Sequence, residues 1–180
     1  DGSVGKSLAY GGTGGVVIVQ GNADSRACIR LSGADVIIGG EIVKPLNDSL
    51  GFIGARSNVK GFLCEYMTSG RVLVLGDPGP WMCAGMTGGV LYLRLQPHLN
   101  FDHAAIQRRL GRGAKVAVQE VGESDLHNLR ELLTTYAEEL KQNHQAEEAE
   151  KALDLFVDWK STFIRVVPLG QQEEQKFATE

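Results

Sequence analysis

The chain has 180 residues, of which 43% are hydrophobic and 22% charged, and its formal net charge at pH 7 is −4. This composition is typical of a globular domain with one core, and the slight acidity disfavours nucleic-acid binding, which needs clustered basic residues. No stretch is apolar enough over a sufficient length to span a bilayer, and no signal-peptide pattern is visible. We therefore expect a cytoplasmic protein with neither a membrane nor a nucleic acid as partner, and the odd number of cysteines, three, agrees with a reducing compartment.

The first half of the chain holds most of the 23 glycines and repeats itself every 18 or 19 residues. The clearest copies are LCEYMTSGRVLVLG (63–76) and MCAGMTGGVLYLRL (82–95), which place Cys64 and Cys83 at equivalent positions. Each copy holds a short run of β-branched residues or leucine bounded by turn residues, which predicts a strand. These strands are expected at 16–19, 35–39, 72–75 and 90–93.

A repeat of this length cannot bury an apolar face by itself, so successive copies must stack and share one core. We therefore predict a mainly β fold in which residues 1–98 form a parallel β-helix with rungs of 18–19 residues. The copy at 41–57 matches by spacing but lacks a clear strand. It is interpreted either as a distorted rung or as a loop.

When the copies of the repeat are aligned, two sets of equivalent positions, called columns here, lead to structural predictions. The first column is small or apolar and predicts an inward ladder of Ala9, Cys28, Leu46, Cys64 and Cys83. A metal site or redox pair at the cysteines is the alternative, but there is no C-x-x-C and the histidines do not fall at zinc spacing. The second column predicts a left-handed corner with positive φ at Gly21, Gly40, Asn58 and Gly76, because glycine and asparagine adopt that conformation most readily.

The pattern of residues 99–168 predicts a C-terminal cap on the β-helix, made of a helix, a strand and two further helices in that order, and residues 169–180 are expected to form a flexible tail. Asp102 is the expected N-cap of a short helix, and a strand is expected at 115–121. Apolar spacing then predicts a helix from Ser124 and a second one over 146–163, whose aromatic stripe is interpreted as core. The helical pair would cover the open end of the β-helix.

One basic cluster lies in this second half of the chain, at Arg108, Arg109, Arg112 and Lys115. It is interpreted either as a site for an anion or acidic partner, or as a solvated helix end. No other constellation of acids, bases or metal ligands stands out, so we predict no catalytic, cofactor-binding or metal-binding residue.

The first strand, around Val17 and Val19, would have an unpaired edge, and natural proteins rarely leave such an edge exposed. We expect this N-terminal rung to stack on earlier rungs, on a partner subunit, or on a second copy by self-association.

The segments YGGTGG, IRLSGADVIIGG, CEYMTSGRVLVLG and CAGMTGGVLYL resemble the GXGXG domain at the C-terminal end of the glutamate synthase large (α) subunit. The resemblance covers roughly residues 5–95, and the ending LRELL…ALDLFVDWKSTFIRVVP is similar to that subunit's C-terminus. Residues 41–57 look like an insertion relative to the family. The resemblance implies a right-handed parallel β-helix.

The resemblance also implies an assembly that transfers the amide nitrogen of glutamine to 2-oxoglutarate in glutamate biosynthesis. There the glutaminase cysteine, the FMN and the iron–sulfur cluster belong to other domains or subunits. The chain is then expected to be a non-catalytic structural part of an oxidoreductase complex. Two alternatives stay open: a β-helix scaffold of another redox complex, of the formylmethanofuran dehydrogenase kind, and an independent enzyme with a site in a groove.

Overall fold

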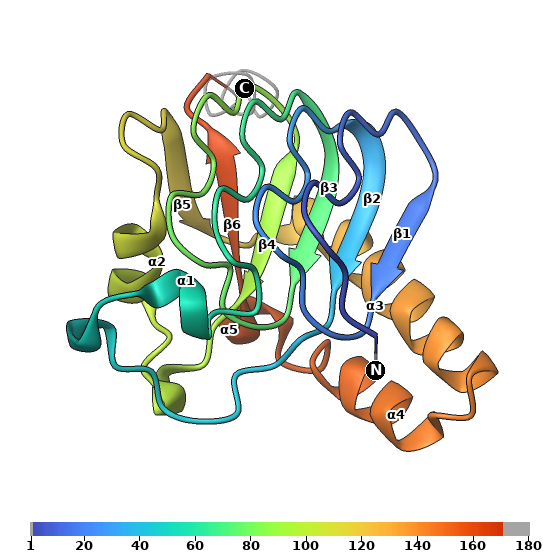
Figure 1. The fold of residues 1–180 in the computed structure, drawn as a ribbon. Coiled ribbons are helices and arrows are strands. Elements are labelled where there is room, and N and C mark those ends of the chain that lie inside the picture. Colours follow the sequence, from blue (N-terminus) through green and yellow to red (C-terminus); the bar gives the residue numbers. More distant parts are fainter. Residues whose placement is uncertain (1, 171–180) are drawn as a thin grey trace.

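The computed structural model describes residues 2–170, so the predicted tail lies, from residue 171 onward, outside the described residues. Its centre is a six-stranded sheet in the order β1-β2-β3-β4-β6-β5 (Figure 1). The first four strands are parallel, whereas β6 runs antiparallel to both β4 and β5. The strands are β1 (Val16–Val19), β2 (Ser32–Ile38), β3 (Ser69–Val74), β4 (Val90–Arg94), β5 (Val116–Glu120) and β6 (Phe163–Pro168).

The chain is therefore mixed α/β with one open mixed sheet, and the prediction of a mainly β fold, a right-handed parallel β-helix with a helical cap, is wrong. Each copy of the repeat other than that at 41–57 contributes a single strand, and its remainder consists of turns with isolated parallel bridges, such as those of Ala23 with Val4 and Val59. In these turns every second residue has positive φ, as at Arg26 (67°), Cys28 (61°) and Arg30 (53°). Left-handed residues interrupt extended backbone, so this part of the repeat cannot form further strands.

The register shows which copies of the repeat supply strands. Val17 pairs with Val36 and Val72 pairs with Leu91, both 19 residues apart, which confirms the repeat for these pairs. Val36, however, pairs with Val72, 36 residues further on. The copy at 41–57 therefore supplies no strand, and of the two interpretations the loop is confirmed.

This loop, residues 41–57, is called the arm. It contains a short 3-10 helix, η1 (Asp48–Leu50), and one turn of α-helix, α1 (Ile53–Arg56). Figure 1 shows the arm in cyan and teal leaving β2 and passing beside α2 (His103–Arg109) before it returns to the repeat. Three of its large apolar side chains point into solvent, namely Val43, Leu50 and Phe52.

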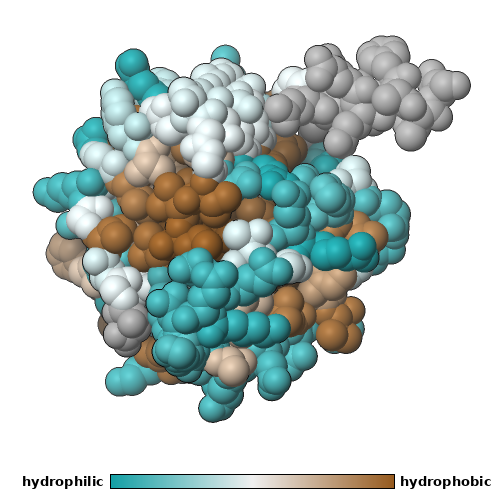
Figure 2. All heavy atoms as spheres, turned by 90° about the vertical axis from the view of Figure 1, so that its right-hand side faces the viewer, coloured by the Kyte–Doolittle hydropathy of each residue, from teal (hydrophilic) through white to brown (hydrophobic). Residues whose placement is uncertain are grey.

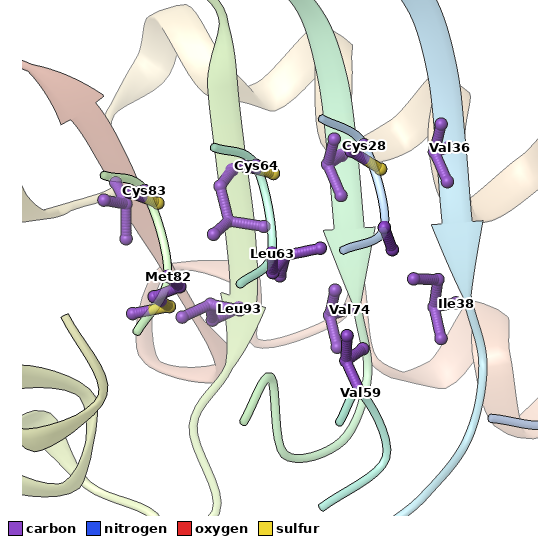
Figure 3. Close-up of a cluster of buried hydrophobic side chains, with 14 of the residues drawn as sticks. Cys28, Val36, Ile38, Val59, Leu63, Cys64, Val74, Met82, Cys83 and Leu93 are labelled. Atoms are coloured by element: carbon purple, nitrogen blue, oxygen red, sulfur yellow. The ribbon is translucent and has the colours of Figure 1, made fainter. Parts of the chain in front are cut away.

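The turns of successive repeats stack on one another against one face of the sheet. Cys28 donates its backbone N–H to Leu8, Cys64 to Ala27, and Cys83 to Leu63, so each turn is bonded to the one before it. Between the turns and the sheet lies an apolar core that contains the three cysteines and alternate residues of the strands. Figure 3 shows Cys28, Cys64 and Cys83 side by side in this core, opposite strand residues such as Val36.

The opposite face of the sheet is covered by α3 (Glu123–Gln142) and α4 (Ala146–Asp154) (Figure 1). Their apolar positions pack on the other set of alternate strand residues, which includes Ile37, Leu73 and Tyr92. The helix predicted from Ser124 is thus confirmed, with its start at Glu123. None of the helices in residues 2–170 is long and apolar enough to cross a membrane.

The last parallel strand, β4, is followed in the sheet by another strand and not by helices. The long helix predicted over 146–163 is wrong, because it divides into α4, a turn and α5 (Trp159–Thr162), after which residues 163–168 form β6. Leu93 pairs with Ile164, so the open hydrogen-bonding edge of β4 is satisfied by β6. The helices cover a face of the sheet, while β6 and β5 close this end.

Candidate functional site

A groove of about 720 Å³ lies between the arm and the body of the molecule. Its floor lies at the carboxyl ends of β1 and β2, where Gly39 and Gly40 follow β2. Ligands of open α/β sheets are commonly bound in such a position. The arm forms one wall, and Tyr136 of α3 and Glu148 of α4 contribute to the other.

Asn58 occupies the corner of this groove where the arm rejoins the repeat. Its Nδ2 donates to Asn22 Oδ1 at 2.8 Å and to the carbonyl of Glu41 at 3.1 Å, and its Oδ1 accepts from the backbone N–H of Asp77 at 2.7 Å. The side chain thus joins three stretches of chain that are far apart in sequence. Replacing Asn58 by glycine would remove all three bonds.

The structure brings the predicted glycine column together at this corner, but not for the predicted reason. None of Gly21, Gly40, Asn58 and Gly76 has positive φ, so the expected left-handed corner is wrong. The glycines are needed because the backbones nearly touch: a Cβ on Gly76 would lie 2.2 Å from the carbonyl oxygen of Gly40 and 2.2 Å from Asn58 Oδ1. A Cβ on Gly40 would lie 2.2 Å from Asn22 Oδ1.

The left-handed backbone conformation is found instead at the cysteines of the apolar column. Cys28, Cys64 and Cys83 have φ values of 61°, 58° and 65° and are completely buried. Leu46, which the repeat placed in the same column, lies in the arm and outside this ladder. Burial, and to a lesser degree the neighbouring Cys28, raises the pKa of Cys64, and burial raises that of Cys83 to about 12. A thiol that reacts as a nucleophile needs the opposite, a lowered pKa and access to solvent.

The arm is anchored to the body by a buried ion-pair network around Arg109. The guanidinium, with 0% exposure, donates to both carboxylate oxygens of Asp77 at 2.7 and 2.9 Å and to both of Asp48 at 2.8 and 2.9 Å. Hydrogen bonds from Arg109, followed by its charge and that of Arg108, hold the pKa of Asp48 below its ordinary value, against the opposing effect of burial. Arg109 is therefore neither of the two things its basic cluster suggested, an anion site or a solvated helix end.

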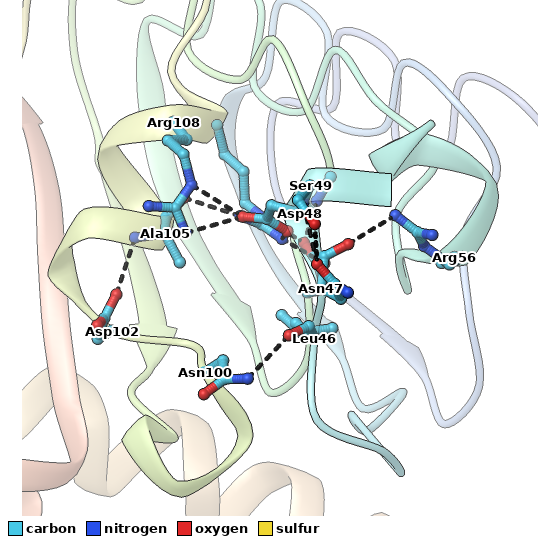
Figure 4. Close-up of polar contacts among 12 residues, drawn as sticks. Leu46, Asn47, Asp48, Ser49, Arg56, Asn100, Asp102, Ala105 and Arg108 are labelled. Carbon is cyan, nitrogen blue, oxygen red and sulfur yellow. Dashed lines mark hydrogen bonds and ion pairs between the residues drawn. The ribbon is translucent and has the colours of Figure 1, made fainter. Parts of the chain in front are cut away.

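Figure 4 shows how this part of the arm meets α2 and the residues before it. Asp48 faces Arg108, and Asn100 donates its side-chain amide to the carbonyl of Leu46 at 2.9 Å. Asp102 accepts from the backbone N–H of Ala105, which confirms it as the N-cap of α2. The arm is thereby fixed at its middle, while its two ends frame the groove.

A second polar cluster lies between the sheet and α3. Tyr92 donates to Asp125 at 2.8 Å, and Asp125 also accepts from the backbone N–H of Gly122 and from Arg165. Nearby, Arg71 forms a bidentate pair with Asp35. Each of these groups links one element to another, so their chemistry is that of structural hydrogen bonding.

The sequence missed several residues of these sites. Arg109 gave no signal beyond its basic neighbours, since its partners lie 32 and 61 residues away. Tyr136 was assigned to an apolar helix face, and its hydroxyl at the groove could have been suspected only from its polar end. Within residues 2–170 no group of three His, Cys, Asp or Glu side chains is arranged to hold a metal ion.

Comparison with known proteins places this geometry in a family. The GXGXG motif pattern matches residues 55–169. The large chain of NADPH glutamate synthase from Bacillus subtilis (strain 168) is 30% identical over 97% of this chain and 10% of its own length. The chloroplastic ferredoxin-dependent glutamate synthase of Spinacia oleracea is 33% identical over 71% of this chain and 7% of its own length. The ferredoxin-dependent glutamate synthase of Pyropia yezoensis is 32% identical over 92% of this chain and 9% of its own length.

The chain thus spans about a tenth or less of the length of these relatives. The match includes the strands β3 to β6, Arg109 and its partner Asp77, and the helices of the far face, whereas Asp48 lies outside it. The resemblance that the glycine-rich repeats and the helical ending indicated is confirmed. This chain belongs to the GXGXG motif family and is related to a segment of the glutamate synthase large chains.

Proposed function

We propose that this chain is a non-catalytic structural part of a glutamate synthase-like oxidoreductase of the cytoplasm. The relatives carry the name glutamate synthase, and the chain covers a small share of each. The reaction, transfer of the amide nitrogen of glutamine to 2-oxoglutarate, would take place on other domains or subunits, which would also hold the FMN and the iron–sulfur cluster.

One observation carries this proposal: the charged residues that are buried as a whole among residues 2–170, Asp77, Arg109 and Asp125, join elements of the fold. Arg109 links α2 to the arm and to the turn after β3, through Asp48 and Asp77. Arg165 of β6 reaches Asp125 of α3. Groups that act as acids or bases in catalysis must instead meet a substrate with a proton to give or take. A framework so cross-linked is suited to hold neighbouring domains in fixed positions.

We further propose that β1 is the surface through which residues 1–98 contact the rest of the complex, while residues 99–168 close the other end. Among residues 2–170 the sheet ends at β1, which pairs with β2 on one side and with no strand on the other. Figure 2 shows an apolar patch on this side of the molecule. There Val16 is 51% exposed, and Leu8, Val17 and Ile18 are partly exposed. An open apolar edge strand is a ready template for association.

The structure changes which residue should be used to test this surface. Val19 is only 4% exposed and Val17 packs partly against the core, so lysine at either position would damage the fold. Val16→Lys instead alters the exposed patch, and Val157→Lys, at a 75% exposed valine between α4 and α5, is the matched control.

Native mass, flavin and iron content, and glutamine-dependent glutamate formation should be measured for both variants in the intact protein. We expect Val16→Lys to disturb assembly and to lower activity only as far as the assembled fraction falls, while Val157→Lys changes neither. If the unchanged protein self-associates and Val16→Lys abolishes this association, the β1 surface binds a second copy of the chain. A Val16→Lys protein that is fully assembled, has all its cofactors and is inactive would contradict the non-catalytic role.

A further inference from the structure

The groove beside the arm has an unbalanced set of charges. Three cationic residues line it, and none of them has a carboxylate partner among residues 2–170: Lys44, Arg56 and Lys60. Arg56 donates to the carbonyls of Asn47 and Gly51, and Lys60 to those of Ala55 and Ser57. Carbonyl groups orient these cations without neutralising their charge.

The acidic residues of the groove, by contrast, are each matched by a cation that does not line it. The pairs are Glu41 with Arg94 at 3.6 Å, Asp77 with Arg109 at 2.7 Å, and Glu148 with Lys151 at 3.1 Å. Arg109 is shared with Asp48 and Lys151 with Glu147, so the compensation is partial. The three cations without a carboxylate partner nevertheless make the groove more positive than the chain as a whole, which is acidic.

A neutral hydrogen-bond donor, the hydroxyl of Tyr136, also lines the groove. Tyr136 is only 5% exposed, yet its hydroxyl lines the groove beside Gly39 and has no hydrogen-bond partner among residues 2–170. Burial, with the charges of Glu41 and Glu148, raises the pKa of Tyr136 to about 12, so the hydroxyl keeps its proton at neutral pH. The hydroxyl reaches the open groove, so it can donate its proton to an acceptor on a ligand in place of water.

We propose that this groove binds a small organic anion that carries at least two acidic groups, carboxylates or phosphates. The volume of about 720 Å³ suits a metabolite of that kind. Lys44 precedes Pro45 at the start of the arm, whereas Arg56 and Lys60 lie at and just beyond its end. Cations at both ends of the arm can each bind a different acidic group of one ligand. The inference does not depend on the assembly role, because the groove and the β1 surface are formed by different residues.

Isothermal titration calorimetry at constant ionic strength would test the proposal in the intact protein, with citrate, inorganic phosphate and pyrophosphate as probes. We expect saturable binding of citrate or pyrophosphate. The probe that binds more tightly identifies the acidic group as carboxylate or phosphate. Tyr136→Phe should weaken binding about tenfold, the effect of losing one hydrogen bond to a charged ligand, and Lys44→Glu, which reverses a charge, should weaken it at least as much.

The matched controls are Lys6→Glu and Tyr10→Phe, which make the same chemical changes at exposed residues outside the groove. We expect both to bind the probes as the unchanged protein does. The proposal would be overturned if no probe bound saturably, or if all four variants bound equally well. It would also be overturned if a hexaglutamate peptide bound while citrate and pyrophosphate did not, since the groove would then accept a protein segment.

Discussion

Replacing Arg109 by methionine should release the arm and destabilise the whole protein. The guanidinium is completely buried and donates to Asp77, to Asp48 and to the carbonyl of Ala105. Methionine has a similar length but leaves Asp77, which is only 2% exposed, without its cation, and leaves Asp48 with the half-exposed Arg108 alone. Removing one partner of a buried ion pair typically costs about 3–5 kcal/mol, so we expect a loss of that size in the free energy of unfolding.

Arg108→Met is the matched control, because Arg108 pairs with the same carboxylate, that of Asp48, from a side chain that is 51% exposed. Exposed ion pairs contribute about 0–1 kcal/mol. Urea unfolding followed by circular dichroism gives both values, and hydrogen exchange reports whether the arm opens locally. Equal effects of the two substitutions, or a loss below about 1 kcal/mol for Arg109→Met, would refute the view that this buried pair anchors the arm.

The same network predicts how stability depends on pH. The pKa of Asp48 is lower in the folded chain than in the unfolded chain, chiefly because Arg109 donates hydrogen bonds to it. Its contribution is therefore fully present above the unfolded pKa, about 4, and is lost as the pH falls through the folded value. Arg109→Met should remove this acid-dependent part, so that unfolding curves of the two proteins converge as the pH is lowered. Curves that stay parallel down to pH 2 would speak against it.

Two further predictions concern the columns of the repeat. Gly76→Ala should cost about 3 kcal/mol or more, because its Cβ would meet a backbone carbonyl at 2.2 Å, whereas Gly14→Ala, with open space around it, should change the unfolding midpoint little. Similar midpoints for the two variants would show that the backbones do not approach so closely. Replacing all three buried cysteines by alanine should cost on the order of 1 kcal/mol per site without changing the metal content of the intact protein. A metal that disappears with Cys28, Cys64 and Cys83 would overturn their packing role.

The sequence predicted the elements whose signals are local. Apolar runs 19 residues apart predicted parallel pairing such as that of Val17 with Val36, and the structure confirms it. Asp102 was found as an N-cap because capping depends on residues three positions apart. The buried cysteines and the family resemblance also followed from the repeat itself.

The fold class and the groove were decided by tertiary structure. A repeat predicts that its copies stack, but it does not predict whether the residues outside the apolar run form further strands or turns. The positive φ at Cys64 accompanies backbone hydrogen bonds to neighbouring turns, which exist only in the folded chain. The predicted helix ended at Phe163, and the sequence assigned no strand to the run FIRVVP, which forms β6 by pairing with the edge of β4. Likewise the burial of Arg109 depends on carboxylates 32 and 61 residues away. Sequence spacing predicts contacts within a copy of the repeat and between adjacent copies. Contacts between segments with no fixed spacing cannot be predicted in this way, because they form only when the chain has folded.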